Sequence, residues 1–237
     1  MTGRDLPTGR EKTARVRAMF DAIAPRYDVV NRVITLGLDQ YWRQRTVRAL
    51  GLPAGAAVLD VACGTGALGE LAARAGYRIV GADMSAGMLA DRRSPMAAVQ
   101  CDASALPFTT SSFDGVICGY ALRNFTDLSA SISEMARVVR PGGRVAVLEV
   151  ATPPNPLVRA GHAIWFRHVV PLIGAALSDP DAYRYLPDSV AYLPRGEALK
   201  KAFRDAGFAT VGQHFLQGGL SQIIVGTRAG VVGAAAP

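Results

Sequence analysis

The sequence predicts an α/β protein built on a seven-stranded, mostly parallel sheet, and three observations lead to this fold class. Short apolar runs alternate with segments of helical periodicity, which is typical of parallel strands joined by right-handed helical crossovers. A glycine-rich turn follows the first apolar run, within residues 58–69. The last two apolar runs, 208–216 and 220–228, are separated by Gln-Gly-Gly and predict an antiparallel hairpin with an antiparallel last strand.

About fifty residues precede the first predicted strand. The helical spacing of Val16, Met19, Phe20 and Ile23 predicts a helix over 11–24, which Pro25 ends. A second helix is expected over 40–50. These residues are too few and too closely joined to the sheet to form a separate domain, so we expect residues 11–50 to be a helical cover over the site.

The remaining elements follow in order. Strands are expected at 57–62, 78–83, 97–101, 114–119 and 143–150, and helices at 67–75, 85–91, 127–138 and 195–206. Pro141-Gly142-Gly143 is expected to be a turn before the fifth strand. A helical insert is expected at 155–190, with one or two helices in 157–177. A parallel sheet finished by a hairpin is the Rossmann-like arrangement of class I methyltransferases, here as one domain over residues 1–237.

Composition excludes several classes of function. The chain has 237 residues and a net charge of +7, but its basic residues are dispersed, so we expect no nucleic-acid partner. The three cysteines, Cys63, Cys101 and Cys118, lack metal-ligand spacing, so no metal is expected. Residues 1–12 are polar and no run of eighteen apolar residues occurs, which leads us to expect a cytoplasmic protein.

The glycine-rich turn indicates a nucleotide-type ligand. Gly64, Gly66 and Gly69 satisfy G-x-G-x-x-G, and Asp83 ends the next apolar run, where an acid can bind the two hydroxyls of a ribose. These features fit NAD and S-adenosylmethionine (SAM) alike. Asp60 favours SAM, because a carboxylate beside the glycines would repel a pyrophosphate, whereas SAM carries an ammonium and a positive sulfonium. A dinucleotide oxidoreductase remains an alternative.

Four blocks of sequence give a more specific indication. They are Met19–Asp28 with Asn31, Thr35–Asp39 and Trp42-Arg43; Ala121–Asp127; Arg137–Gly143 with Glu149; and Tyr183–Ser189. With these blocks the chain resembles the UbiE/MenG/Coq5 family of SAM-dependent quinone C-methyltransferases. Two positions depart from the family pattern: Ala121 replaces a glycine and Thr35 replaces a serine. The departures leave the exact acceptor open.

The resemblance implies which residues bind SAM. It assigns Thr65, Asp83, Asp102 and Ala103 to the cofactor, and the chemistry agrees, because Asp102 can accept from the adenine amine while the Ala103 N–H serves a ring nitrogen. Met84 is expected against the adenine. Tyr27 is expected to close the pocket from above, and Asp60, Gly64, Gly66 and Gly119 complete the candidate cofactor site.

The candidate catalytic residues are Arg123, Asn124 and Tyr185. Arg123 and Asn124 follow the fourth strand, whose end faces the methyl group in this fold, so Arg123 is expected to stabilise a phenolate or orient a water while Asn124 holds a hydroxyl. Arginine cannot itself be the base. The alternatives for a base are the three histidines, His162, His168 and His214.

These observations predict a SAM-dependent C-methyltransferase of a demethylmenaquinol-type hydroquinone in menaquinone biosynthesis. The alternatives are C- or O-methylation of another aromatic or polyketide acceptor, and a catalytically silent SAM-fold protein. The partner is then a lipophilic quinol. The amphipathic segment 157–177 indicates an expected peripheral contact with the inner face of the membrane, against the alternative of a core-covering helix, and a homodimer is a further expectation.

Overall fold

A seven-stranded sheet forms the centre of the molecule in the computed structural model, which describes residues 8–230 apart from the side chains of 180, 181 and 184. The strands are β1 (Ala57–Val61), β2 (Arg78–Asp83), β3 (Ala97–Gln100), β4 (Phe113–Gly119), β5 (Val139–Val150), β6 (Phe208–Leu216) and β7 (Ser221–Arg228). Their order is β3-β2-β1-β4-β5-β7-β6. Strand β7 is antiparallel to both neighbours, and the other neighbouring pairs are parallel. The predicted fold class is confirmed.

Strand β5 differs from its prediction, because Pro141-Gly142-Gly143 lies inside it rather than before it. Val139 pairs with Phe113, and the next pair joins Arg144 to Gly115, so the segment between Val139 and Arg144 bulges out of the ladder. Gly142 has a φ of 75°, a left-handed conformation that glycine adopts without strain. The bulge lets a proline occur within a strand, since residues in the bulge need not donate to the ladder.

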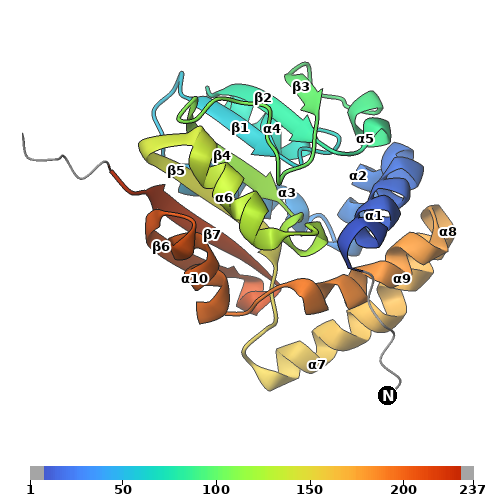
Figure 1. Cartoon of the computed structure of the whole chain (residues 1–237). Helices are drawn as coiled ribbons and strands as arrows, with labels where there is room; N and C mark the ends of the chain where they lie inside the picture. The colour runs from blue at the N-terminus through green and yellow to red at the C-terminus, as the bar shows by residue number, and fades with distance from the viewer. Residues whose placement is uncertain (1–7, 231–237) are drawn as a thin grey trace, which may run out of the picture.

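Helices cover both faces of the sheet. Helix α6 (Leu128–Val138) and α10 (Glu197–Asp205) lie over one face, and α3 (Leu38–Leu50) and α4 (Ala67–Arg74) lie over the other (Figure 1). On the second face Val47 and Leu50 of α3 pack with Val58 and Ile117 of the sheet. The third helix of the N-terminal segment therefore belongs to a sheet face, and the cover itself is made by the residues before it.

The cover consists of α1 (Gly9–Ile23), a 3₁₀ turn at Ala24–Arg26 and α2 (Tyr27–Ile34). Two contacts hold α1 over the carboxyl ends of the strands. Asp21 accepts hydrogen bonds from the hydroxyl of Ser85 at 2.5 Å and from the amide of Gly87 at 2.9 Å, at the start of α5 (Ala86–Ala90). At the other end, the buried ammonium of Lys12 donates to the carbonyl of Phe125 at 2.7 Å.

The predicted insert contains α7 (Pro156–Ile164), a π-helical stretch at Trp165–Val169, α8 (Val170–Leu177) and α9 (Pro180–Ser189). Helices α7 and α8 are the two helices expected in 157–177. Helix α8 packs against α9 at Gly174, where a Cβ would lie 2.3 Å from the Tyr183 side chain, and against α2 of the cover. In the described part of the chain, no helix is both long and apolar enough to cross a membrane.

Candidate active site

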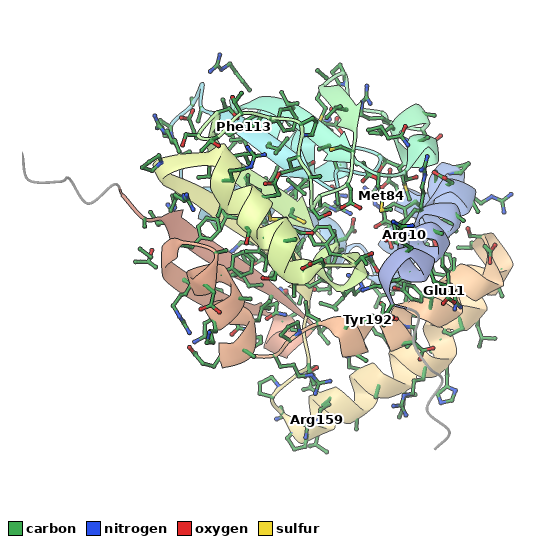
Figure 2. All side chains as sticks on the ribbon, in the orientation of Figure 1. Arg10, Glu11, Met84, Phe113, Arg159 and Tyr192 are labelled. Atoms are coloured by element: carbon green, nitrogen blue, oxygen red, sulfur yellow. The ribbon has the colours of Figure 1, made fainter. Side chains whose placement is uncertain are left out.

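A cavity opens at the carboxyl ends of β1, β2 and β4, beneath the cover, and holds about 930 Å³ of empty space including its mouth. Figure 2 shows Met84, just after β2, on the side of the molecule nearest α1, whereas Phe113 lies at the opposite end of the sheet. The structure brings most predicted site residues to the cavity wall, namely Tyr27, Asp60, Gly64, Thr65, Asp83, Met84, Asp102, Ala103, Gly119 and Asn124. Gly66, Arg123 and Tyr185 are not in the wall.

Asp83 shapes the glycine-rich turn as well as lining the cavity. Its two carboxylate oxygens accept from the amides of Gly64 and Ser85, each at 2.8 Å. Each oxygen retains a second lone pair, so the carboxylate remains able to accept from a ribose. Gly66 has a φ of 87°, and a Cβ there would lie 2.9 Å from the Ser94 Cβ. Gly66 is therefore needed for the conformation and close packing of the turn, and its contact with the ligand stays a prediction.

The cavity wall around the glycine-rich turn is polar, and hydrogen bonds within the protein hold its side chains in place. Thr65 donates its hydroxyl to Asp28 of α2 at 3.0 Å, which links the turn to the cover. Asp102 accepts from the amide and hydroxyl of Ser104 through one oxygen, at 2.8 and 2.7 Å. Burial raises the pKa of the Tyr27 phenol, so this side chain is a neutral donor at the top of the cavity.

Asp60 and Arg43 place opposite charges in the same wall. Asp60 is 1% exposed, and neither carboxylate oxygen meets the geometry of a hydrogen bond among the described residues, although the backbone N–H of Gly69 lies near enough to lower the pKa of the carboxyl. Burial raises the pKa of Asp60 to about 7, and the positive charge of Arg43 opposes this rise. Arg43 is itself buried, and its Nε has no acceptor within hydrogen-bond reach in residues 8–230.

Asn124 is the predicted catalytic residue that does line the cavity. Its amide nitrogen donates to the Tyr120 carbonyl at 3.4 Å, while its Oδ1 is buried without a partner in the described structure. A hydroxyl on a bound molecule would satisfy that oxygen. The cavity wall also contains the apolar rings of Phe20 and Phe125, which suit a ring-shaped acceptor.

Arg123 points away from the cavity into a buried ion pair. A terminal guanidinium nitrogen bonds the carboxylate of Glu149, which is 0% exposed, and another of its bonds reaches the Tyr120 carbonyl at 2.9 Å. Its Nε donates to the Ser189 hydroxyl at 3.2 Å. The Nε and one terminal nitrogen of Arg123 are therefore occupied by the protein, and its action on an acceptor stays a prediction.

Tyr185 and the alternative bases are also outside the wall. Burial raises the pKa of the Tyr185 phenol to about 12, and its hydroxyl has no partner among the described residues. His162, His168 and His214 lie in α7, the π-helical stretch and β6, and none lines the cavity. Two thiols, Cys63 and Cys101, do line it, but burial raises the pKa of both, which keeps them protonated.

Arg43 lines the cavity, whereas from the sequence it was only a second choice, after Arg123 and together with Arg26, as a cation for the acceptor. It lies on α3, whose sequence neighbours pack on the sheet, and only its own face of the helix reaches the cavity. A signal was present: Asp39 and Arg43 have the i, i+4 spacing of an ion pair, and both are buried. A buried pair of charges is unusual on a helix and points to a functional position.

The wall fits a ligand that carries both charges and hydroxyls. The unpartnered atoms are the Asp60 carboxylate, the Arg43 Nε and the Asn124 Oδ1, and buried polar atoms are ordinarily hydrogen-bonded. A positively charged or zwitterionic nucleoside would satisfy them, with Asp83 placed for its ribose. A dinucleotide fits less well, because the Asp60 carboxylate would repel the negative charge of its pyrophosphate.

Comparisons with known proteins identify relatives over most of the chain. Residues 8–228 match the model of the ubiE/COQ5 methyltransferase family. The chain is 43% identical to a demethylmenaquinone methyltransferase of Roseiflexus sp. (strain RS-1), over 95% of this chain and 98% of that protein. It is 37% identical to the ubiquinone/menaquinone biosynthesis C-methyltransferase UbiE of Geobacter sp. (strain M21), over 92% and 98%. A solved SAM-dependent methyltransferase of Thermotoga maritima, a possible histamine N-methyltransferase by its title, superposes with a TM-score of 0.64 at 19% identity, over 90% and 99%.

Proposed function

Because the chain belongs to the ubiE/COQ5 methyltransferase family, we propose that it transfers a methyl group from SAM to a ring carbon of a demethylmenaquinol-type hydroquinone. The main support for this acceptor is the 43% identity, over 95% of the chain, to a relative named for that substrate. The cavity supports the proposal, because its wall contains both charged side chains and apolar, aromatic ones.

SAM supplies a methyl group on a positively charged sulfur. Asp83 would hold the ribose hydroxyls, and Asp102 with the Ala103 amide would hold the adenine, against Met84. Asp60 would receive the ammonium of the methionine end. In this arrangement the residues around the glycine-rich turn bind and orient the donor, and they leave the side near Asn124 for the acceptor.

Around the acceptor the chain excludes water and fixes geometry. Asn124 Oδ1 would accept the hydroxyl hydrogen of the ring, while Phe20 and Phe125 would hold the ring's faces. Correct alignment of two reactants supplies a large part of the rate when the donor is already activated. A ring carbon attacks the methyl group more readily once the adjacent hydroxyl has lost its proton to water or a base.

The test is incubation of the protein with methyl-labelled SAM and a panel of acceptors, followed by mass analysis of the products. We expect a product heavier by one methyl group with a demethylmenaquinol, and label on carbon. The panel includes a demethylubiquinol-type ring, simple phenols and polyketides. Methylation of one of those with no reaction of the demethylmenaquinol would overturn the proposed acceptor.

One observation favours including the second set of acceptors. Ala121, where the family pattern has glycine, is buried in the cavity wall beside Asn124. A methyl group there narrows the space next to the acceptor. Specialised acceptors are therefore the second candidate function, and the same assay distinguishes it.

We also propose that α7 and α8 contact the surface of a membrane that holds the lipophilic acceptor. Leu157, Ile164 and Leu172 are 82%, 61% and 70% exposed, and residues 155–178 contain no acidic side chain but include Arg159 and Arg167. Figure 2 shows Arg159 at the outer edge of α7. Exposed apolar side chains flanked by arginines fit an anionic lipid surface.

A vesicle sedimentation experiment tests this contact. We expect the protein to sediment with phosphatidylglycerol vesicles, more weakly as salt is raised, and we expect Leu157→Glu to reduce the bound fraction severalfold. Gln44→Glu adds the same charge at an exposed position of α3 and should leave binding nearly unchanged. Equal effects of the two variants would show that charge alone, rather than this face, governs the contact.

A further inference from the structure

Arg43 is a buried cation with hydrogen-bonding capacity left over. It is 6% exposed, and its ion-pair partner is Asp39, whose carboxylate lies 3.7 Å from its Nε. That separation is too long for a hydrogen bond, and the Nε has no acceptor among the described residues. One terminal nitrogen lies 4.0 Å from where a Cβ on Gly119 would be, so the guanidinium reaches the end of β4. The ring of Tyr120 lies 5.8 Å from its Cζ.

Asp60 stands in the same wall with the opposite charge. The two groups are close enough for Arg43 to lower the pKa of Asp60, yet they form no ion pair within 4.0 Å in the part of the chain that the structure describes. The cavity wall thus contains both a carboxylate and a guanidinium, each with unused bonding capacity. Buried charges without full hydrogen bonding are unfavourable unless a ligand completes them.

We infer that Arg43 binds the carboxylate of SAM's methionine end, with Asp60 on the adjacent ammonium, so that together they recognise an α-amino acid zwitterion. The inference rests on SAM as the methyl donor and is independent of which acceptor is methylated. An arginine fork matches a carboxylate in two parallel bonds, which a lysine cannot reproduce. Arg43 is then the residue that distinguishes SAM and S-adenosylhomocysteine from nucleosides that lack the carboxylate.

This assignment separates two roles for a cation in the cavity. If the cation stabilises the phenolate of the acceptor, its removal would leave the affinity for the methyl donor unchanged. If the cation binds the methionine carboxylate, its removal would weaken ligands that have this carboxylate and leave ligands without it nearly unchanged. The two roles therefore predict different affinities for the donor in a binding experiment without any acceptor.

The experiment measures binding by calorimetry for two ligands, S-adenosylhomocysteine and its decarboxylated form, which keeps the ammonium. We expect Arg43→Met to weaken S-adenosylhomocysteine at least about tenfold, as loss of a charge-assisted bond does, and to change the decarboxylated ligand less than about threefold. Arg43→Lys should recover part of the loss. Arg45→Met, an exposed arginine on the same helix, should match the wild type with both ligands.

Three outcomes would overturn the inference. Equal weakening of both ligands would mean that Arg43 supports the shape of the cavity. Unchanged affinity for both would mean that Arg43 does not touch the donor. If Arg43→Met does not fold by circular dichroism, Arg43→Lys carries the test, and an unchanged preference of that variant for the carboxylate would contradict a bidentate contact. A wild-type protein that binds S-adenosylhomocysteine but methylates no quinol would overturn the proposed acceptor and leave this inference standing.

Discussion

Replacing Arg123 with alanine is expected to lower the free energy of unfolding by about 3–5 kcal/mol, the range observed when one partner of a buried ion pair is removed. Glu149 is 0% exposed, and its carboxylate accepts from Arg123 and, at 2.8 Å, from the Val150 amide. Alanine would leave this carboxylate buried with its cation gone. Urea unfolding followed by circular dichroism measures the change.

Two further variants control this prediction. Arg74→Ala breaks the surface pair with Glu70, in which Arg74 is 72% exposed, and should change stability by less than about 1 kcal/mol. The double variant Arg123→Met with Glu149→Leu removes both charges and should recover most of the loss. If Arg123→Ala were as stable as the wild type but inactive at saturating SAM, Arg123 would act on the acceptor after all, as its position after β4 predicts from sequence.

The difference between Arg123 and Asn124 shows where sequence reasoning reached its limit. Both residues follow β4, and both were expected to face the crevice at its end. They lie in a single 3₁₀ turn, Leu122–Asn124, so neighbouring side chains point in different directions. Asn124 faces the cavity, and Arg123 turns toward Glu149 on β5 and Ser189 at the end of α9. A partner that comes from a distant element is not visible in local spacing.

The elements with a strong local signal were predicted most accurately. Strand β2 has the predicted bounds, and the acids at the ends of β1 and β2 both line the cavity, because parallel strands bring their carboxyl ends to one edge. The bulge in β5 was mistaken for a turn, because proline and glycine mark both. Arg43 was missed as a donor contact because its placement depends on how α3 packs on the sheet.

Asp60→Asn is expected to stabilise the ligand-free protein at pH 8 by up to about 4 kcal/mol, since burial raises the pKa of Asp60 from 3.8 to about 7 and each pKa unit corresponds to about 1.4 kcal/mol. Below about pH 4 both folded and unfolded states carry the proton, and the carboxyl has no such effect. Between the two pKa values the folded state retains a proton that the unfolded state has released. Wild-type stability therefore falls as pH rises through this interval.

The gain in stability from Asp60→Asn should accordingly be small at pH 4, grow up to pH 7 and stay constant above it, as measured by urea unfolding at each pH. Asp83→Asn is the comparison, because burial also raises the pKa of Asp83, but its carboxylate accepts two backbone amides and an asparagine would meet one of them with a donor. The lost hydrogen bond should offset the gain, so the net effect of this variant at pH 8 should be smaller than that of Asp60→Asn. A gain from Asp60→Asn that did not vary with pH would contradict the raised pKa.

The same substitution should weaken S-adenosylhomocysteine binding at least about tenfold, because the amide cannot offer a negative charge to the ligand's ammonium. The ionised form of Asp60 would then destabilise the ligand-free protein, and the ammonium of the donor would compensate its charge on binding. That pattern is expected of binding sites, where local stability is given up for function. Asp60→Asn with unchanged affinity at pH 8 would show that the carboxylate does not contact the donor, and calorimetry on the same samples used for unfolding decides between the two results.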